Sequence, residues 1–237
     1  MVITSNGHAK GVMAKSGKPI KAIVNPELGS GRIQLIQAPK LQDAVFEIRG
    51  TAPLVIHRFS VKTKREIDEK NNAGKSSSSK KKREPINPDD VFNEARYVSQ
   101  DGWDGFNASA IRAGMIDACR LISFKMTLAK MSVFVVQDGW DAQEPQIPLI
   151  RIYGKAVRQD DMCRVATGQP YIAHRPVYNP WSAKVHIRWD SDQFSVKDVA
   201  ALLMRVGAQV GIGEGRPFSK NSGGMGWGTF EIVGDGK

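Results

Sequence analysis

Cysteine and histidine are scarce in this chain of 237 residues, and neither shows the spacing of metal ligands. The two cysteines, Cys119 and Cys163, are too few and too far apart in sequence for a disulfide framework or a zinc site. The four histidines show no ligand spacing among themselves or with the cysteines. We therefore expect reduced thiols, no metal and no cofactor.

Long apolar runs are also missing. No run approaches the roughly 20 apolar residues that a membrane span needs, and the first residues lack the apolar core of a signal peptide. These absences predict a cytoplasmic protein with no membrane partner. The hydrophobic share of 41% lies somewhat below the globular average, so we expect part of the chain to remain outside the packed core.

The net charge of +10 is concentrated in two segments. Residues 1–40 hold six Lys and Arg against one Glu, and residues 58–84 hold ten against four acidic residues. A near-neutral body with two basic segments suits contact with a polyanion, although such segments can also serve only solubility. We predict a basic N-terminal arm over 1–40 and disorder over 61–85, around the Lys/Ser run at 75–83.

Alternation of apolar and polar residues predicts strands at 44–50 and 183–190. Three further strands are expected at 131–136, 146–154 and 229–233, and residues 54–57 are expected to extend the first strand beyond Pro53. The turn residues Asp138 and Gly139 suggest that 146–154 is the hairpin partner of 131–136.

Helices are predicted where apolar residues recur three and four positions apart. A short helix is expected after Asn87 and Pro88, and a second follows Asn107. A third is expected to start with a capping box, Ser195 and Asp198. The buried face predicted for the second helix contains Ile111, Met115, Ala118, Cys119 and Ile122.

Without its insertions, this order is βαββαβ, which predicts an α+β protein with a ferredoxin-like (RRM-like) antiparallel sheet and two helices on one face. The other sheet face is left open for a ligand. Residues 41–237 form one domain in this interpretation, with a basic insertion at 51–106 and a thumb-like ribbon at 155–182.

Seven glycines lie within residues 211–228, just before the last predicted strand. Such a loop lets backbone N–H groups approach an anion closely, but it also suits tight packing against a sheet. It follows a helix and precedes a strand, which is the reverse of a dinucleotide-binding turn. A phosphate-binding loop at Gly74 is excluded as well, because Glu69 stands where that motif needs glycine.

The order of elements and the position of the glycine-rich loop resemble the RAMP superfamily, the RNA-binding proteins of CRISPR systems. The similarity is greatest to the backbone subunits that polymerise along a guide RNA, and it extends to possible relatives in phages or plasmids that coat single strands. It rests mainly on Gly211–Gly228 and on the turn and helix from Asp101 to Cys119. It implies a homo-oligomer or filament along a strand.

Nucleic-acid contacts are predicted for cations and glycines in the presumed loops and for rings that stack unpaired bases. Trp103, Phe106 and Tyr171 are additional candidate rings. The candidate site residues are Arg58, Lys80, Lys81, Lys82, Arg112, Tyr178, Trp181, Gly213, Gly215, Arg216, Phe218, Lys220, Gly224, Gly226 and Trp227.

Catalysis is the less favoured interpretation. Some RAMP proteins cleave RNA without a metal at a histidine, and some backbone subunits do so with a loop aspartate before the first helix. The resemblance points to His57, Asp101 or Asp104 for these roles, yet the Asp-Gly pairs are also ordinary turns. We expect a non-catalytic protein that binds single-stranded RNA or DNA. The alternatives are a RAMP-type endoribonuclease and a structural or adaptor protein of a phage or mobile element.

Overall fold

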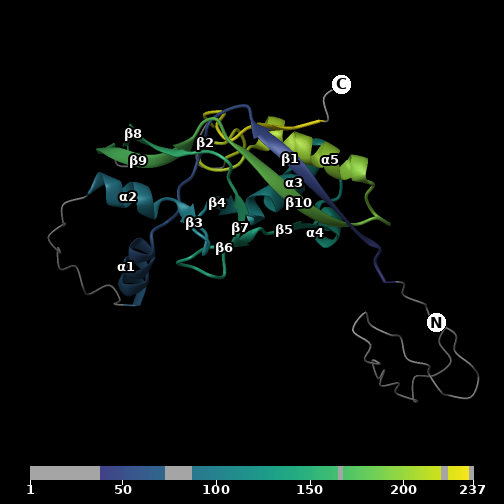
Figure 1. Cartoon of the computed structure of the whole chain (residues 1–237), viewed down its shortest axis with the longest axis horizontal. Coiled ribbons are helices and arrows are strands. Elements are labelled where there is room, and N and C mark those ends of the chain that lie inside the picture. Colours follow the sequence, from purple (N-terminus) through teal and green to yellow (C-terminus); the bar gives the residue numbers. More distant parts are fainter. Residues whose placement is uncertain (1–37, 73–86, 165–167, 220–223, 235–237) are drawn as a thin grey trace, which may run out of the picture. The chain divides into compact units, whose positions relative to one another are not determined.

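The computed structural model describes residues 38–72, 87–164, 168–219 and 224–234 (Figure 1). Contacts divide the chain into two units, Met1–Ala38 and Pro39–Lys237, and the fold described below is that of the second. The predicted N-terminal arm, apart from its last three residues, and the Lys/Ser run at 75–83 lie outside the described residues.

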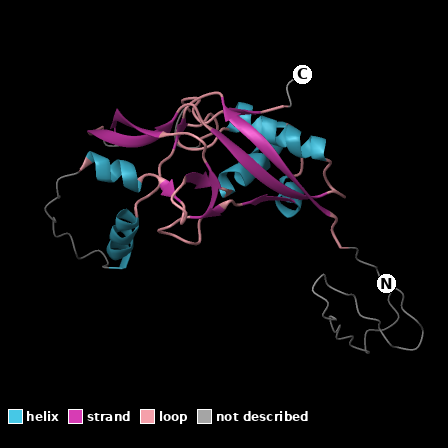
Figure 2. Ribbon diagram, in the orientation of Figure 1, coloured by secondary structure: helices cyan, strands magenta, loops and turns pink. Residues whose placement is uncertain are grey.

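The central sheet has four strands in the order β11-β1-β10-β5, and all neighbouring strands are antiparallel. Its strands are β1 (Leu41–Gly50), β5 (Val133–Val136), β10 (Ser182–Asp190) and β11 (Phe230–Ile232). Helix α3 (Ser109–Leu121) lies between β1 and β5 in the chain, and α5 (Val196–Arg205) lies between β10 and β11. The predicted α+β class with an antiparallel sheet is confirmed (Figure 2).

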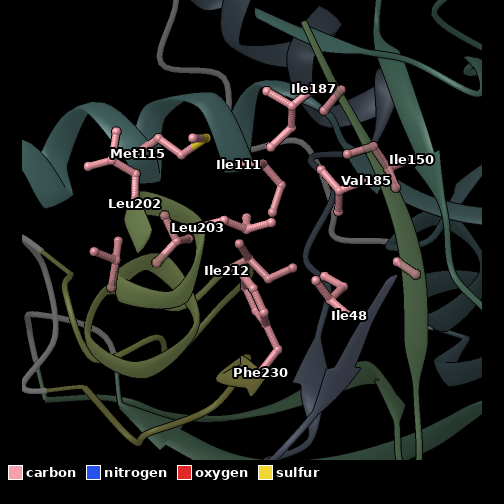
Figure 3. Close-up of a cluster of buried hydrophobic side chains, with 14 of the residues drawn as sticks. Ile48, Ile111, Met115, Ile150, Val185, Ile187, Leu202, Leu203, Ile212 and Phe230 are labelled. Carbon is pink, nitrogen blue, oxygen red and sulfur yellow. The ribbon is translucent and has the colours of Figure 1, made fainter. Parts of the chain in front are cut away.

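The core lies between this sheet and the two helices (Figure 3). Alternate residues of β1 and β10 point inward, including Ile48, Val185 and Ile187, and they share one buried cluster with Ile111 and Leu203 of the helices. Helix α5 begins with the predicted capping box, in which Ser195 and Asp198 bond reciprocally. It continues into a π-helical turn, η2 (Val206–Val210).

Two smaller sheets complete the second unit. One has the order β2-β9-β8 and consists of β2 (Leu54–Val55), β8 (Ala156–Arg164) and β9 (Pro170–Tyr178). The other has the order β3-β4-β7-β6 and consists of β3 (Tyr97–Val98), β4 (Asp104–Asn107), β6 (Gly139–Trp140) and β7 (Pro148–Arg151). Three more helices are α1 (Val61–Asn72), α2 (Pro88–Glu94) and α4 (Met126–Ser132).

Two strand predictions were wrong in their pairing. Residues 146–154 are not the hairpin partner of 131–136, because β7 pairs with β4 and β6 while β5 pairs with β10. Residues 54–57 do not extend β1, because β2 pairs with β9 in a different sheet. Apart from the local β6–β7 pairing, these pairings join segments more than 40 residues apart, and local turn signals do not reveal such partners.

The prediction of disorder over 61–85 was also wrong at its start, where the chain forms α1. In addition, Ile122 is 42% exposed and does not belong to the buried face of α3. The short helix after Asn87 is confirmed as α2, with the Asn87 side chain accepting a hydrogen bond from the Asp89 N–H. The segment predicted as a ribbon contains the antiparallel hairpin β8–β9.

Candidate functional site

The glycine-rich loop packs closely on β2. The Glu214 N–H donates to the Val55 carbonyl at 2.9 Å, and the Gly228 N–H donates to the Pro53 carbonyl at 2.8 Å. Gly213 has φ +76°, and a Cβ there would overlap the Val55 carbonyl oxygen. The need for glycine at this position therefore comes from packing against β2. Contact of the loop with phosphate remains a prediction.

The loop carries one carboxylate, Glu214, which joins it to the hairpin and to the segment after β2. Arg175 Nη2 lies 2.7 Å from Glu214 Oε1, and His57 Nδ1 lies 3.1 Å from Oε2. Burial alone would raise the pKa of Glu214, but hydrogen bonds from His57 and Arg175 outweigh it and hold this pKa at about 2. Arg175 is itself buried and also contacts Asp161 at 3.2 Å.

These groups adjoin a cleft of about 330 Å³ between residues 56–60, α2 and β9. Two exposed rings line it, Phe59 and Tyr171, and the His57 ring stacks on Phe59 with centroids 5.7 Å apart. His174 also lines the cleft, and its Nδ1 lies 2.8 Å from Asp160 Oδ1. The cleft therefore contains two histidines, each with one ring nitrogen against a carboxylate.

The structure does not support Arg58 as a phosphate contact. Its side chain is buried and donates to Asp141 at 3.2 Å, to Glu144 at 3.0 Å and to Gln143 at 2.8 Å. Its Nη groups bond to these three acceptors, and its unpartnered Nε–H is buried, so the guanidinium does not reach a ligand in solvent. The residue that sequence reasoning assigned to binding instead anchors the segment after β2 to the turn at 141–144.

Two other predicted cations are held by backbone carbonyls. Arg112 donates to the carbonyls of Val133 at 3.0 Å and Lys130 at 2.6 Å, and its guanidinium lies over the Phe134 ring. Arg216 donates to the Gly213 carbonyl at 3.1 Å within the glycine-rich loop. Lys80, Lys81, Lys82 and Lys220 lie outside the described residues.

Tyr178 and Trp181 were wrongly predicted as exposed rings for base stacking. Both are buried, because β9 ends between packed layers and its last four residues, 175–178, are all covered. The Trp181 Nε1–H donates to the Ala52 carbonyl at 2.8 Å, and the indole covers Gly50. Burial raises the pKa of Tyr178. Phe106 is likewise buried in the core.

Of the other predicted loop rings, Phe218 and Tyr171 are exposed and Trp103 and Trp227 are half-buried. The Trp227 ring packs on Gly215, whereas a Cβ at Gly226 would meet no other atom within 4 Å. Gly224 lies against the backbone of Pro217. The site residues of the glycine-rich loop are therefore brought together, while the cations and rings predicted elsewhere are dispersed.

The catalytic candidates differ in their surroundings. Asp104 forms an ion pair with Arg96, with Arg96 Nη2 2.6 Å from Asp104 Oδ1, in a half-buried position. Asp101 lies exposed in the turn before β4. His57 alone of the three faces the cleft, and its partner Glu214, distant in sequence, was not predicted as a site residue.

The central sheet has an exposed face opposite the helices. Val45 is 61% exposed, and it lies in register with His186, which in turn faces Val136. The next row joins Asp43, Arg188 and Phe134, with Arg188 Nε 2.8 Å from Asp43 Oδ1. Apolar side chains and paired charges thus alternate across this open face, which the strand alternation predicted.

Comparison with known proteins gives no match to a family model and no match among curated proteins. Within the described ranges, no group of three or more His, Cys, Asp or Glu is placed to hold a metal ion. No helix among the described residues is long and apolar enough to cross a membrane.

Proposed function

We propose that this chain binds single-stranded nucleic acid without cleaving it, and that its central sheet is a ferredoxin-like core. The strand order β11-β1-β10-β5, with α3 and α5 as the two connecting helices, supports the ferredoxin-like assignment. The other strands form the two smaller sheets, and all of them belong to two insertions in the chain. One insertion lies between β1 and α3, and the other lies between β5 and β10.

The proposal includes a RAMP-like arrangement. Three features support it: the glycine-rich loop follows α5 and η2 and leads into β11, the hairpin β8–β9 projects from the segment before β10, and a long insertion follows β1. Assembly of adjacent copies along a strand is part of the same proposal, and it rests on the family resemblance alone.

The observation that carries the proposed function is the open face of the central sheet. A sheet face on which exposed apolar side chains lie between charged ones suits the bases of an unpaired strand. Val45 and Phe134 are exposed there, beside Lys184 and Arg188. Duplex bases are stacked inside their helix, so such a surface favours single strands.

Charge on the open face itself is nearly balanced, because Asp43 pairs with Arg188 and Glu231 pairs with Arg49. Nearly all of the net charge of +10 belongs to residues 1–37, 73–86 and 220–223, since the described cations outnumber the described acids by one. We propose that these lysine-rich segments neutralise phosphates while the open face contacts bases.

Placing a carboxylate at the centre of the open face is expected to weaken binding. Val45→Glu should lower the affinity for a fluorescein-labelled single strand roughly tenfold, because the charge repels phosphates and removes an apolar contact. The matched control is Ala201→Glu on the exposed side of α5, where Arg205 four residues on accommodates the charge. Fluorescence anisotropy at low salt measures both. Equal affinities for the two variants would exclude the open face as the binding surface.

A second candidate function is cleavage of RNA, which the contact between His57 and Glu214 favours. A carboxylate against Nδ1 orients a histidine for acid–base chemistry at Nε2, and this histidine lines the cleft. Incubation with labelled RNA in the presence of EDTA should yield product on a gel if this function holds, and His57→Gln should abolish it. The proposed binding function predicts intact RNA with both proteins.

A further inference from the structure

Arg151 differs from most arginines of the described residues in having no carboxylate partner. Seven of the thirteen described arginines pair with Asp or Glu within 4 Å: Arg49, Arg58, Arg96, Arg120, Arg158, Arg175 and Arg188. Arg151 is exposed on β7, and its only acidic contact among the described residues involves its backbone N–H, which donates to Asp138 at 2.9 Å. Its guanidinium donors are therefore available to an outside acceptor.

Two aromatic rings hold this guanidinium in place. The Arg151 Cζ lies 5.2 Å from the Tyr153 ring centroid and 6.0 Å from the Trp103 ring centroid. We call Trp103, Arg151 and Tyr153 the Arg151 platform. Stacking on rings leaves the edge of a guanidinium free to donate hydrogen bonds, and it fixes the plane in which they point.

The Trp103 ring of the platform packs on two glycines of the sheet β3-β4-β7-β6. Cβ atoms at Gly105 of β4 and Gly139 of β6 would both contact the indole, at 3.0 and 2.8 Å. Glycine at both positions allows the ring to lie directly on the sheet. Trp103 is half-buried there while Tyr153 is 44% exposed, so one ring supports the arginine and the other presents a face to solvent.

The platform is continuous with the open face of the central sheet. Tyr153 forms an antiparallel bridge with Ser182, whose N–H and carbonyl bond to it at 3.0 and 2.8 Å. Ser182 lies in register with Arg49 of β1 on the other side. Residues directly opposite in an antiparallel pair project to the same side, so Tyr153, Ser182 and Arg49 lie in one row on the exposed surface.

We infer that the Arg151 platform is a second contact site for the bound strand, where an unpaired base stacks on Tyr153 and Arg151 and a phosphate accepts hydrogen bonds from the guanidinium. This inference rests on the proposed function and assigns it residues outside the central sheet. A cation in contact with two rings and without a carboxylate partner fits a ligand that is both aromatic and anionic, and a nucleotide within a single strand has both properties.

Photocrosslinking tests this contact directly. Single strands in which 5-iodouracil replaces uracil or thymine are bound at low salt and irradiated, and crosslinked peptides are identified by mass spectrometry. Crosslinks at Tyr153 or Trp103 are expected. Crosslinks confined to other residues, with the strand bound normally, would overturn the platform and leave the proposed function standing.

Affinities of matched variants give an independent readout. Arg151→Ala and Tyr153→Leu should each weaken single-strand binding roughly fivefold to a hundredfold, the range for loss of one stacked base, whereas Tyr153→Phe should retain it. Arg120→Ala, which removes an exposed arginine paired with Asp117 on α3, is the control and should bind normally. Unchanged affinity of both platform variants contradicts the inference. Failure of the unmodified chain to bind any strand overturns the proposed function together with it.

Discussion

Replacing Arg58 by alanine should lower the free energy of unfolding by about 3–5 kcal/mol, the usual cost of breaking a buried ion pair from one side. The Arg58 and Asp141 side chains are 1% and 2% exposed, so Asp141 would lose its cation without gaining solvent. Glu144 and Gln143 would also lose a donor. Backbone N–H groups of Gln143 and Glu144 still donate to Asp141, which keeps the loss within this range.

Urea unfolding of the two proteins measures the difference. Arg120→Ala serves as the control, because its side chain is 57% exposed and its pair with Asp117 spans 3.8 Å, and a change below about 0.5 kcal/mol is expected. Arg58→Lys retains the charge but not the forked donors, so an intermediate loss is expected. An unfolding free energy for Arg58→Ala within about 0.5 kcal/mol of the unmodified protein would contradict the role of Arg58 as a buried anchor.

Substitution of Gly228 by alanine is expected to cost about 3 kcal/mol of unfolding free energy. Its φ of +66° disfavours any L side chain by roughly 1–2 kcal/mol. A Cβ there would also overlap the Ile212 carbonyl. The two hydrogen bonds of this backbone, to Pro53 and from Ile212, would then weaken, and each is worth about 1 kcal/mol.

Substitutions at two other glycines distinguish the cost of a positive φ from the cost of steric overlap at the Cβ position. Gly226 has φ +74° but nothing within 4 Å of its Cβ position, so Gly226→Ala should show only the conformational cost of about 1–2 kcal/mol. Gly234 has open space and no positive φ, and Gly234→Ala should be neutral. The melting temperatures of the three variants, measured by thermal unfolding, should be lowest for Gly228→Ala and highest for Gly234→Ala. Equal stabilities for Gly228→Ala and Gly226→Ala would show that close packing against the Ile212 backbone does not matter.

Local patterns predicted the elements with one clear buried face. The spacing of Ile111, Met115 and Cys119 indicated α3, and the alternation in 183–190 indicated β10. Helix α1 was missed because its charges suggested a solvated run, although Arg65 and Glu69 stand four residues apart as helical ion pairs do. Strand β9 was missed for a different reason. Its residues 175–178 are buried on both faces, so they show no alternation.

Only those features of the candidate site that follow from the order of elements along the chain could be predicted from the sequence. The place of the glycine-rich loop before the last strand followed from the sequence. The contacts of Glu214 with His57 and Arg175 did not, because these residues come from three segments far apart in the chain. The same holds for the Arg151 platform, in which Trp103 and Arg151 meet only because β4 pairs with β7.

Binding of the unmodified chain of 237 residues to single strands tests the central claim most directly. Anisotropy of labelled single-stranded RNA and DNA, and of a duplex of the same sequence, is recorded from about 50 to 200 mM salt. The proposed function predicts tighter binding of a single strand than of the duplex, and a linear fall of log K with log salt. No binding of either single strand at the lowest salt, or a salt-independent affinity, would contradict it.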